Sequence, residues 1–171
     1  GIERIGKATE KIVPLMVVLY VGASIYIIST NIQKLPSILT EIFTQSLAPD
    51  AIYGGLIGVL VTGIKRAVFS NEGGVGSASI AHSAAKTDEP VREGIVAMVG
   101  PFIDTIIVCF MTASVILITR DINPQYIAGD ASIKGVELTS AAFGSVISWF
   151  PIILSIVVFL FSYSTMISWY Y

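Results

Sequence analysis

The chain alternates between long runs of apolar residues and short polar connections. Residues 12–33 form a run of 22 without a charged side chain, which as a helix would extend about 33 Å and could cross a bilayer. Residues 94–119 form a run of 26 with a single charge, Asp104. The 34 residues from Leu138 to Tyr171 carry no charge, and we predict a span over 146–170 within them. Each of the three runs therefore predicts a membrane crossing.

A further apolar stretch is interrupted. Residues 51–64 are uncharged but number only 14, too few to cross a bilayer. They continue to residue 85 through a segment rich in Gly, Ser and Ala, where Gly73 and Gly74 would break an ordinary helix. Non-helical backbone at membrane depth persists only where it lines a cavity or is buried in protein. We predict one discontinuous crossing over 51–85, made of two half-helices with an unwound middle.

The predicted fold class is therefore an all-α membrane protein with about four transmembrane helices, one of them discontinuous. The positive-inside rule places residue 1 and the 86–93 loop in the cytoplasm. Its basis is five cationic side chains on one side, Arg4, Lys7, Lys11, Lys86 and Arg92, against three on the other, Lys34, Arg120 and Lys134. The chain opens without Met in a charged approach segment and stops in an apolar run. We expect residues 1–171 to be a fragment of a single domain.

Composition narrows the class of protein. Hydrophobic residues make up 54% of the chain and charged residues 13%, whereas a soluble domain is about a quarter charged. This argues against a disordered protein and an ordinary soluble enzyme. The net charge of −2 leaves no basic excess for nucleic acid. The single cysteine, Cys109, and the single histidine, His82, exclude an internal disulfide and metal sites built from several Cys or His.

The break over residues 70–77 is the strongest candidate for chemistry. It reads Ser-Asn-Glu-Gly-Gly-Val-Gly-Ser, and an unwound backbone there would expose N–H groups at the start of one half-helix and carbonyls at the end of the other. Such a break can hold a zwitterion, with the ammonium on carbonyls or on Glu72. A kinked helix packed through small residues is the alternative. A Glu in hydrocarbon is costly and favours function.

Asp104, near the middle of its run, is a candidate ion ligand or proton carrier. Its alternative role is a hydrogen bond to the exposed N–H groups of the broken helix. In the last run, Ser162, Ser164 and Thr165 supply hydroxyl oxygens that suit Na⁺, unless they bond back to their own helix carbonyls. Trp169 follows one turn after Thr165 and is by itself typical of an interfacial aromatic residue.

An enzyme is not expected. His82 and Ser83 could suggest a hydrolase, but no nucleophile-elbow motif accompanies them. Glu72 and Asp104 could form an intramembrane carboxylate pair, but neither lies in a protease motif. Cys109 is most simply a small apolar side chain in a membrane helix.

The segment GIKRAVFSNEGGVGSASIAHSAAKTDEPVREG (63–94), followed by FIDTIIVC (102–109), resembles the sodium:alanine symporter family of amino acid carriers. The opening residues 1–20 and the closing residues 161–171 are similar to the same family. The resemblance implies a variant of the leucine-transporter fold, with two inverted five-helix repeats whose first helices are broken. This chain would hold the last helix of the first repeat and the first three of the second.

The resemblance also implies roles for particular residues. The break, with Phe69, Ser70, Asn71, Glu72, Gly73 and Gly74, would contribute to the substrate cavity, and Trp169 would wall it. Ser164 and Thr165 would contribute oxygens to a sodium site. Asp104 and Glu72 are candidates for ion or proton coupling from their place in apolar segments, apart from the resemblance. The family often has Ala where this chain has Gly74, and proline where it has Ser79.

The function that we expect is sodium-coupled symport of small amino acids such as alanine or glycine, by alternating access around a mid-membrane site. The alternatives are a proton-coupled amino acid transporter, a channel and an intramembrane enzyme. The expected coupling ion is Na⁺, with no organic cofactor and no other metal. The expected partners are a small amino acid, the lipid bilayer and the missing N-terminal and C-terminal parts of the same transporter, with no nucleic acid. The expected location is the plasma membrane of a bacterial or archaeal cell, as a multi-pass protein.

Overall fold

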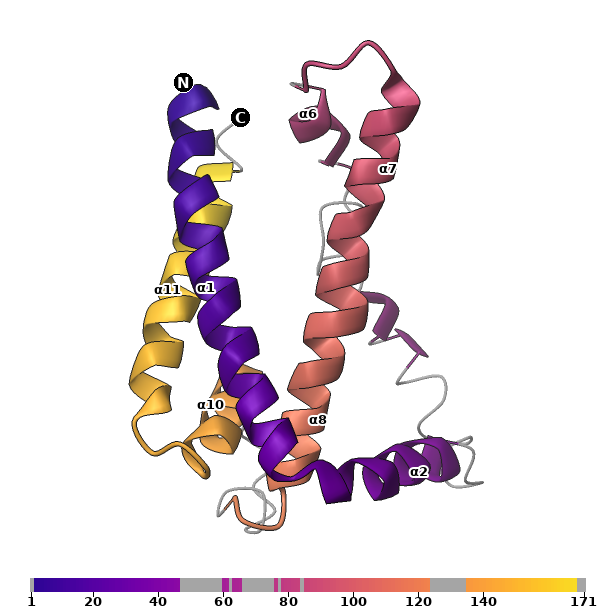
Figure 1. Cartoon of the computed structure of the whole chain (residues 1–171), viewed down its shortest axis with the longest axis vertical. Coiled ribbons are helices and arrows are strands. Elements are labelled where there is room, and N and C mark those ends of the chain that lie inside the picture. The colour runs from indigo at the N-terminus through magenta and orange to yellow at the C-terminus, as the bar shows by residue number, and fades with distance from the viewer. Residues whose placement is uncertain are drawn as a thin grey trace. The chain divides into compact units, whose positions relative to one another are not determined.

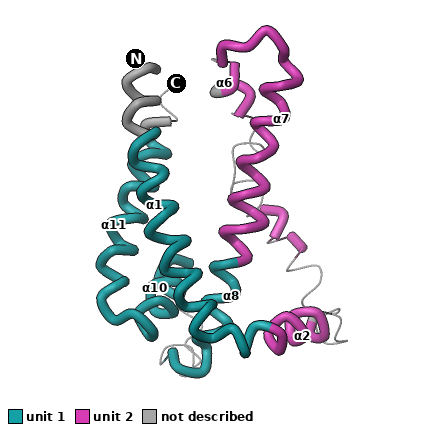
Figure 2. Tube along the Cα trace, viewed as in Figure 1, with its two compact units in different colours: residues 1–35, 111–171 teal, residues 36–110 magenta. Residues whose placement is uncertain are grey.

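The regular elements that the structure describes are all helical (Figure 1). The structure is a computed structural model, and it describes residues 2–46, 60–61, 63–65, 76, 78–83, 85–123 and 135–168. Contacts divide the chain into two compact units (Figure 2): residues 1–35 with 111–171, and residues 36–110. The all-α prediction is therefore confirmed for the described part of the chain.

Helix α1, Ile2–Thr30, contains the first predicted span. Its apolar part, Glu10–Thr30, is long and apolar enough to cross a membrane. Pro14 is accommodated inside it. A 3₁₀ turn, η1, covers Ile32–Lys34 and includes residue 33, where the predicted span ends, whereas the α-helix itself ends at Thr30. The polar side chains of Thr30 and Asn31 explain this end, since both donate hydrogen bonds to the carbonyl of Ile27 at 3.0 Å and so satisfy a carbonyl of the last turn.

The second long apolar helix runs without interruption over Pro90–Thr119 and is also long and apolar enough to cross a membrane. It is made of α7 (Pro90–Pro101), the π-helical segment η3 (Phe102–Val108) and α8 (Cys109–Thr119). It begins at Pro90 rather than at residue 94 because a proline fits the first turn of a helix, where its missing N–H has no partner to lose. The predicted run over 94–119 is otherwise helical throughout.

The last apolar run is helical over a shorter range than predicted. Helix α11 covers Phe150–Ser168, and its apolar part, Phe150–Met166, is shorter than the two long apolar helices. The predicted span begins at residue 146, four residues before the first residue of the helix. Residues 145–149 form turns in which Ile147 N–H donates to Phe143 O at 2.8 Å and Phe150 N–H donates to Ile147 O at 3.0 Å. Pro151 then occupies the first turn of α11, as prolines commonly do.

Two shorter helices occupy segments that the sequence analysis treated as connections. Helix α10 covers Val136–Gly144, and helix α2 covers Leu35–Ser46. The helix in α2 follows from its apolar side chains, which recur every three or four residues. The sequence analysis did not predict this helix.

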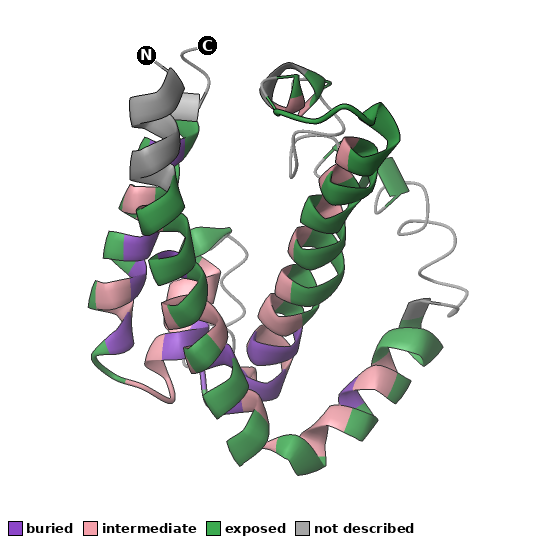
Figure 3. Ribbon diagram, turned by 45° about the horizontal axis from the view of Figure 1, so that its top comes forward, coloured by how far each residue is buried: buried purple, intermediate pink, exposed green. Residues whose placement is uncertain are grey.

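The core of the unit formed by 1–35 and 111–171 is an aromatic cluster centred on Phe143. This side chain is fully buried, and its ring centroid lies 5.4 Å from that of Tyr20 and 5.0 Å from that of Phe150. The Tyr20 hydroxyl is also hydrogen-bonded to Thr112 Oγ1. Helix α1 packs along α11, and buried residues gather near α10 (Figure 3). The cluster thus joins α1, α8, α10 and α11.

Gly144, at the end of α10, lies so close to the ring of Pro151 in α11 that a larger residue does not fit without a shift. A Cβ atom at this position would lie 2.8 Å from Pro151 Cγ, closer than real Cβ contacts allow. We predict that Gly144→Ala destabilises the whole protein by about 1–3 kcal/mol through overpacking, measured as a lower Tm in detergent. Gly22→Ala is the control, because a Cβ there meets nothing within 4 Å. Equal Tm values for the two variants would contradict the predicted close packing.

Candidate functional site

Most of the predicted substrate-binding residues lie outside the described residues. These are Phe69, Ser70, Asn71, Glu72, Gly73, Gly74 and Trp169. Their assignment remains a prediction from the sequence. On either side of residues 69–74, the described residues are helical at 63–65, in a turn at Gly76 and helical again from residue 78.

The backbone on the C-terminal side of the predicted break turns at Gly76. Its φ of +89° lies in the region that glycine enters without steric cost. Helix α6, Ala78–His82, begins two residues later. The Ser79 hydroxyl donates a hydrogen bond of 2.9 Å to Gly76 O, an interaction that a proline at this position could not make. The described residues thus include a helix restart next to a non-helical glycine, while the crossing over 51–85 stays a prediction.

A contact between His82 and Glu93 joins the end of α6 to the start of α7. His82 Nδ1 lies 2.5 Å from Glu93 Oε1, with 36% and 24% of the two side chains exposed. Glu93 lies in the first turn of α7 and His82 in the last turn of α6, where the helix dipoles favour a negative and a positive charge respectively. The sequence analysis considered His82 only as a hydrolase candidate and missed this partner.

The loop that His82 and Glu93 close is itself hydrogen-bonded. Ser83 N–H donates to Ser79 O, and Ala85 N–H donates to His82 O, each at 3.0 Å. Thr87 Oγ1 accepts from Glu89 N–H at 3.2 Å, just before α7 begins. The turn from α6 to α7 is therefore held by its own backbone as well as by the His82–Glu93 contact. The signal in the sequence that could have indicated this contact is a histidine, His82, at the end of one helix and an acid, Glu93, in the first turn of the next.

Asp104 lies in the π-helical segment η3, which the sequence analysis did not anticipate. The segment precedes α8, and Cys109 N–H donates to Asp104 O, a hydrogen bond from residue i to i−5. Pro101 precedes η3 directly and lacks an N–H, so the ordinary α-helical ladder loses a bond just before the π turn. Asp104 is half-buried. π turns inside α-helices occur frequently at functional sites, so this geometry keeps Asp104 a candidate.

The predicted sodium ligands lie on α11. Ser164 is buried, with 7% of its surface exposed, whereas Thr165 is exposed. Both hydroxyls donate to Phe161 O, at 2.8 Å and 3.0 Å, which is the back-bonding alternative named from the sequence. A hydroxyl that donates its proton to a carbonyl keeps its oxygen lone pairs. These hydrogen bonds therefore do not prevent either oxygen from binding a cation.

The candidate residues are distributed between the two compact units. Asp104, His82 and Glu93 belong to residues 36–110, and Ser164 and Thr165 belong to the other unit. Within the described ranges, no group of three or more His, Cys, Asp and Glu side chains could hold a metal ion.

The described residues include two long apolar helices, an acid within one of them and a buried serine on another helix. These features are typical of helical membrane proteins that handle polar solutes. Comparison with known proteins is more specific. The profile of the sodium:alanine symporter family matches residues 1–171, and the chain belongs to that family.

Three named relatives match the whole of this chain. The sodium/alanine symporter AgcS of Methanococcus maripaludis is 41% identical over 172 residues, which are 37% of its own length. A Bacillus subtilis protein named probable sodium/glutamine symporter GlnT is 36% identical over 173 residues, or 35% of its length. A sodium/proton-dependent alanine carrier protein of a Bacillus species is 33% identical over 181 residues, or 41% of its length.

The chain thus spans less than half the length of these relatives. No solved structure matches it.

The His82–Glu93 contact should contribute measurably to stability. We predict that His82→Ala and Glu93→Gln each destabilise the full-length protein in detergent by roughly 1 kcal/mol, measured as a lower Tm. The double variant should lose little more than either single variant, because the two changes remove one interaction.

Arg92→Gln is the matched control for this cycle, because Arg92 is exposed and adjacent to Glu93. Its effect should add to that of His82→Ala. Additive losses for the His82 and Glu93 variants would show that the contact does not form in the protein.

Proposed function

We propose that the protein to which this chain belongs is a sodium-coupled symporter that moves small amino acids such as alanine or glycine into the cell. The observation that carries the proposal is the family match over residues 1–171. The names of two relatives combine sodium with alanine or with glutamine. Cation coupling and amino acid substrates therefore recur among the relatives, while the amino acid named differs.

The substrate would bind at the break between residues 69 and 74. A small amino acid carries one carboxylate and one ammonium group. Exposed N–H groups at the start of a half-helix stabilise the carboxylate, and free carbonyls or Glu72 stabilise the ammonium. Gly73 and Gly74 carry no side chain that would fill this space, and Trp169 would limit the size of the substrate. Gly76, Ser79 and α6 describe how the chain returns to a helix after the break.

The coupling ion would bind at Ser164 and Thr165. Na⁺ is a small hard cation that prefers oxygen ligands, and the two hydroxyls lie next to each other on α11. Their shared acceptor, Phe161 O, leaves both hydroxyl protons directed along the helix. The oxygen lone pairs then remain for a cation, with further ligands supplied by the rest of the transporter. Binding of ion and substrate to one conformation would couple their transport.

No covalent chemistry is required of this protein. Symport needs binding at a central site and a conformational change that opens the site to each side in turn. A plasma-membrane location in a bacterial or archaeal cell follows from this function.

Loss of a sodium ligand should weaken the dependence of transport on Na⁺ specifically. We predict that Ser164→Ala and Thr165→Ala in the full-length transporter raise the Na⁺ concentration for half-maximal alanine uptake about tenfold, the effect of losing roughly 1.4 kcal/mol of ion binding. The measurement is uptake of labelled alanine into proteoliposomes at a series of Na⁺ concentrations.

Ser162→Ala is the matched control. Ser162 lies on the same helix, is exposed and also donates its hydroxyl to a carbonyl one turn earlier, Val158 O at 2.9 Å. Its sodium dependence should change less than about twofold, since a surface substitution of this kind costs little. An equal loss in all three variants would indicate a general effect on the helix and would overturn the assignment of Ser164 and Thr165.

Proton-coupled transport is the second candidate function. The observation that favours it is the position of Asp104 in a π turn of an apolar helix. A carboxyl group in a membrane helix can carry a proton between two states of a transporter. Glu72 is the other acid that could do so. One relative is named as a sodium/proton-dependent carrier.

Neutral substitutions distinguish the two coupling modes. If a proton is the coupling ion, Asp104→Asn or Glu72→Gln should abolish alanine uptake driven by a pH gradient in the absence of Na⁺. If Na⁺ alone is coupled, the unsubstituted protein should show no such uptake. The measurement is the initial rate of labelled alanine uptake into proteoliposomes in Na⁺-free buffer with an imposed pH gradient. Unchanged pH-driven uptake in both variants would exclude Asp104 and Glu72 as proton carriers.

A further inference from the structure

The contact between His82 and Glu93 joins two side chains that can each bind a proton. His82 Nδ1 lies 2.5 Å from Glu93 Oε1, and an ionised carboxylate only accepts hydrogen bonds. Nδ1 therefore carries the hydrogen of this contact, which leaves the other ring nitrogen, Nε2, as the position for a further proton. Because 36% of the His82 side chain is exposed, water can exchange protons with the ring.

A second proton changes the contact into an ion pair between two full charges. It binds at Nε2, where one N–H bond forms, and the resulting imidazolium still donates from Nδ1 to the carboxylate. The proton is taken from the solvent, and no other bond of the protein changes. Glu93 lies in the first turn of α7, where the helix dipole favours its negative charge. Because opposite full charges attract at hydrogen-bond distance, proton uptake tightens the link between α6 and α7.

Within the described residues, Glu93 is the charged group in contact with His82. The other charged side chains of α6, α7 and the loop between them are exposed, and are Lys86, Asp88, Glu89 and Arg92. Asp104 lies in the same continuous helix as Glu93, about 16 Å further along at 1.5 Å per residue. Water and salt weaken the effect of exposed or distant charges, so a charge on His82 acts mainly on Glu93.

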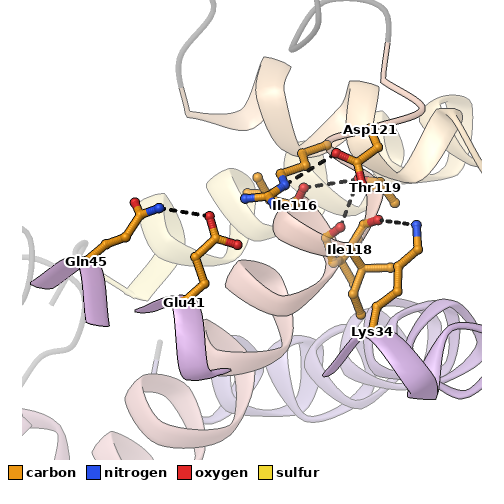
Figure 4. Close-up of polar contacts among 9 residues, drawn as sticks. Lys34, Glu41, Gln45, Ile116, Ile118, Thr119 and Asp121 are labelled. Atoms are coloured by element: carbon orange, nitrogen blue, oxygen red, sulfur yellow. Dashed lines mark hydrogen bonds and ion pairs between the residues drawn. The ribbon is translucent and has the colours of Figure 1, made fainter. Parts of the chain in front are cut away.

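Other charged contacts of the described residues respond differently. Arg120 Nε lies 3.4 Å from Asp121 Oδ1, and Lys34 Nζ donates to Ile118 O at 3.4 Å (Figure 4). An arginine stays protonated in proteins and a backbone carbonyl does not titrate, whereas histidine changes its charge near neutral pH. Among these contacts, the one between His82 and Glu93 is therefore suited to respond to pH.

We propose that His82 and Glu93 form a regulatory proton site, which holds α6 more firmly on α7 at low pH and so slows transport. α6 lies against the start of α7 (Figure 1) and follows the non-helical Gly76. The ligand of the site is a proton from the solvent around the 86–93 loop. A proton that binds more tightly while α6 is docked favours the docked conformation, because binding and conformation are reciprocally linked.

The regulatory role rests on the proposed function in one respect. The substrate would bind at the break between residues 69 and 74, and α6 is the helix that follows this break in the sequence. A contact that fixes α6 therefore adds to the free energy needed for the conformational change that opens the site. Na⁺ remains the coupling ion in this proposal, and the proton at His82 is not carried across the membrane.

The proton site is tested through the stability of the full-length transporter in detergent, which requires no transport. The Tm is measured at pH 6 and at pH 8 with and without Glu93→Gln, both in the unsubstituted protein and in His82→Gln. We expect Glu93→Gln to lower the Tm about twofold more at pH 6 than at pH 8, because the contact that it weakens is stronger when His82 is protonated. In the His82→Gln background, its effect should be the same at both pH values.

Glu89→Gln is the matched control. Glu89 is an exposed acid directly before α7, and its side chain makes no capping hydrogen bond, so its effect on the Tm should be small and equal at the two pH values. An effect of Glu93→Gln that does not change with pH would overturn the proton site. A pH-dependent effect that persists in His82→Gln would place the proton on another group and would equally overturn it.

The regulatory role is tested by the initial rate of labelled alanine uptake into proteoliposomes at saturating Na⁺, with the same pH on both sides so that no proton gradient drives uptake. We expect uptake to be severalfold slower at pH 6 than at pH 8, and this difference to be lost in His82→Gln. A pH dependence that is the same in both proteins would overturn the regulatory role. Absence of any alanine uptake would contradict the proposed function, while the Tm measurements would still decide the proton site.

Discussion

The constraint on which the structure depends is that a peptide group in hydrocarbon must find its hydrogen-bond partner within the protein. The described apolar runs meet it in the simplest way, as helices whose bonds are internal. Each departure from an α-helix therefore leaves backbone groups that need other hydrogen-bond partners. Such departures persist where side chains, other segments or ligands satisfy the freed groups, and these are the positions at which a carrier can bind a polar solute.

The departures in this chain have identifiable local causes. Pro101 removes an N–H directly before the π turn that holds Asp104. Gly76 takes a positive φ before α6 restarts, and the Ser79 hydroxyl satisfies its carbonyl. On α11, Ser164 and Thr165 share the carbonyl of Phe161 without breaking the helix. Proline, glycine and hydroxyl residues thus introduce polar groups into apolar helices at separate points of the sequence.

The connections outside the apolar runs are ordered by side-chain contacts. His82 and Glu93 close the turn between α6 and α7, and Lys34 binds the last turn of α8. The aromatic cluster around Phe143 ties the turn at Gly144 to α1 and α11.

The long apolar helices could be predicted from the sequence because their signal is additive over twenty or more residues. Their ends could not, since a single side chain decides them, as Asn31 does for α1 and Pro90 for α7. Helix α2 was missed because its amphipathic stripe has no long apolar run. The π turn was missed because one lost hydrogen bond leaves no periodic signal. The His82–Glu93 contact joins two elements, and sequence periodicity describes one element at a time.

The central proposal is that the full-length protein couples the transport of two solutes without any covalent step. Measuring whether the flux of one solute drives the flux of the other tests this proposal most directly. Because coupling between two bound ligands is reciprocal, the substrate must drive the ion as the ion drives the substrate. Proteoliposomes containing the full-length transporter are given external alanine, and the entry of labelled Na⁺ is followed. The account predicts that alanine accelerates Na⁺ entry and that Ser164→Ala weakens this effect. Na⁺ entry that is unchanged by alanine, together with alanine uptake that persists without Na⁺, would contradict it.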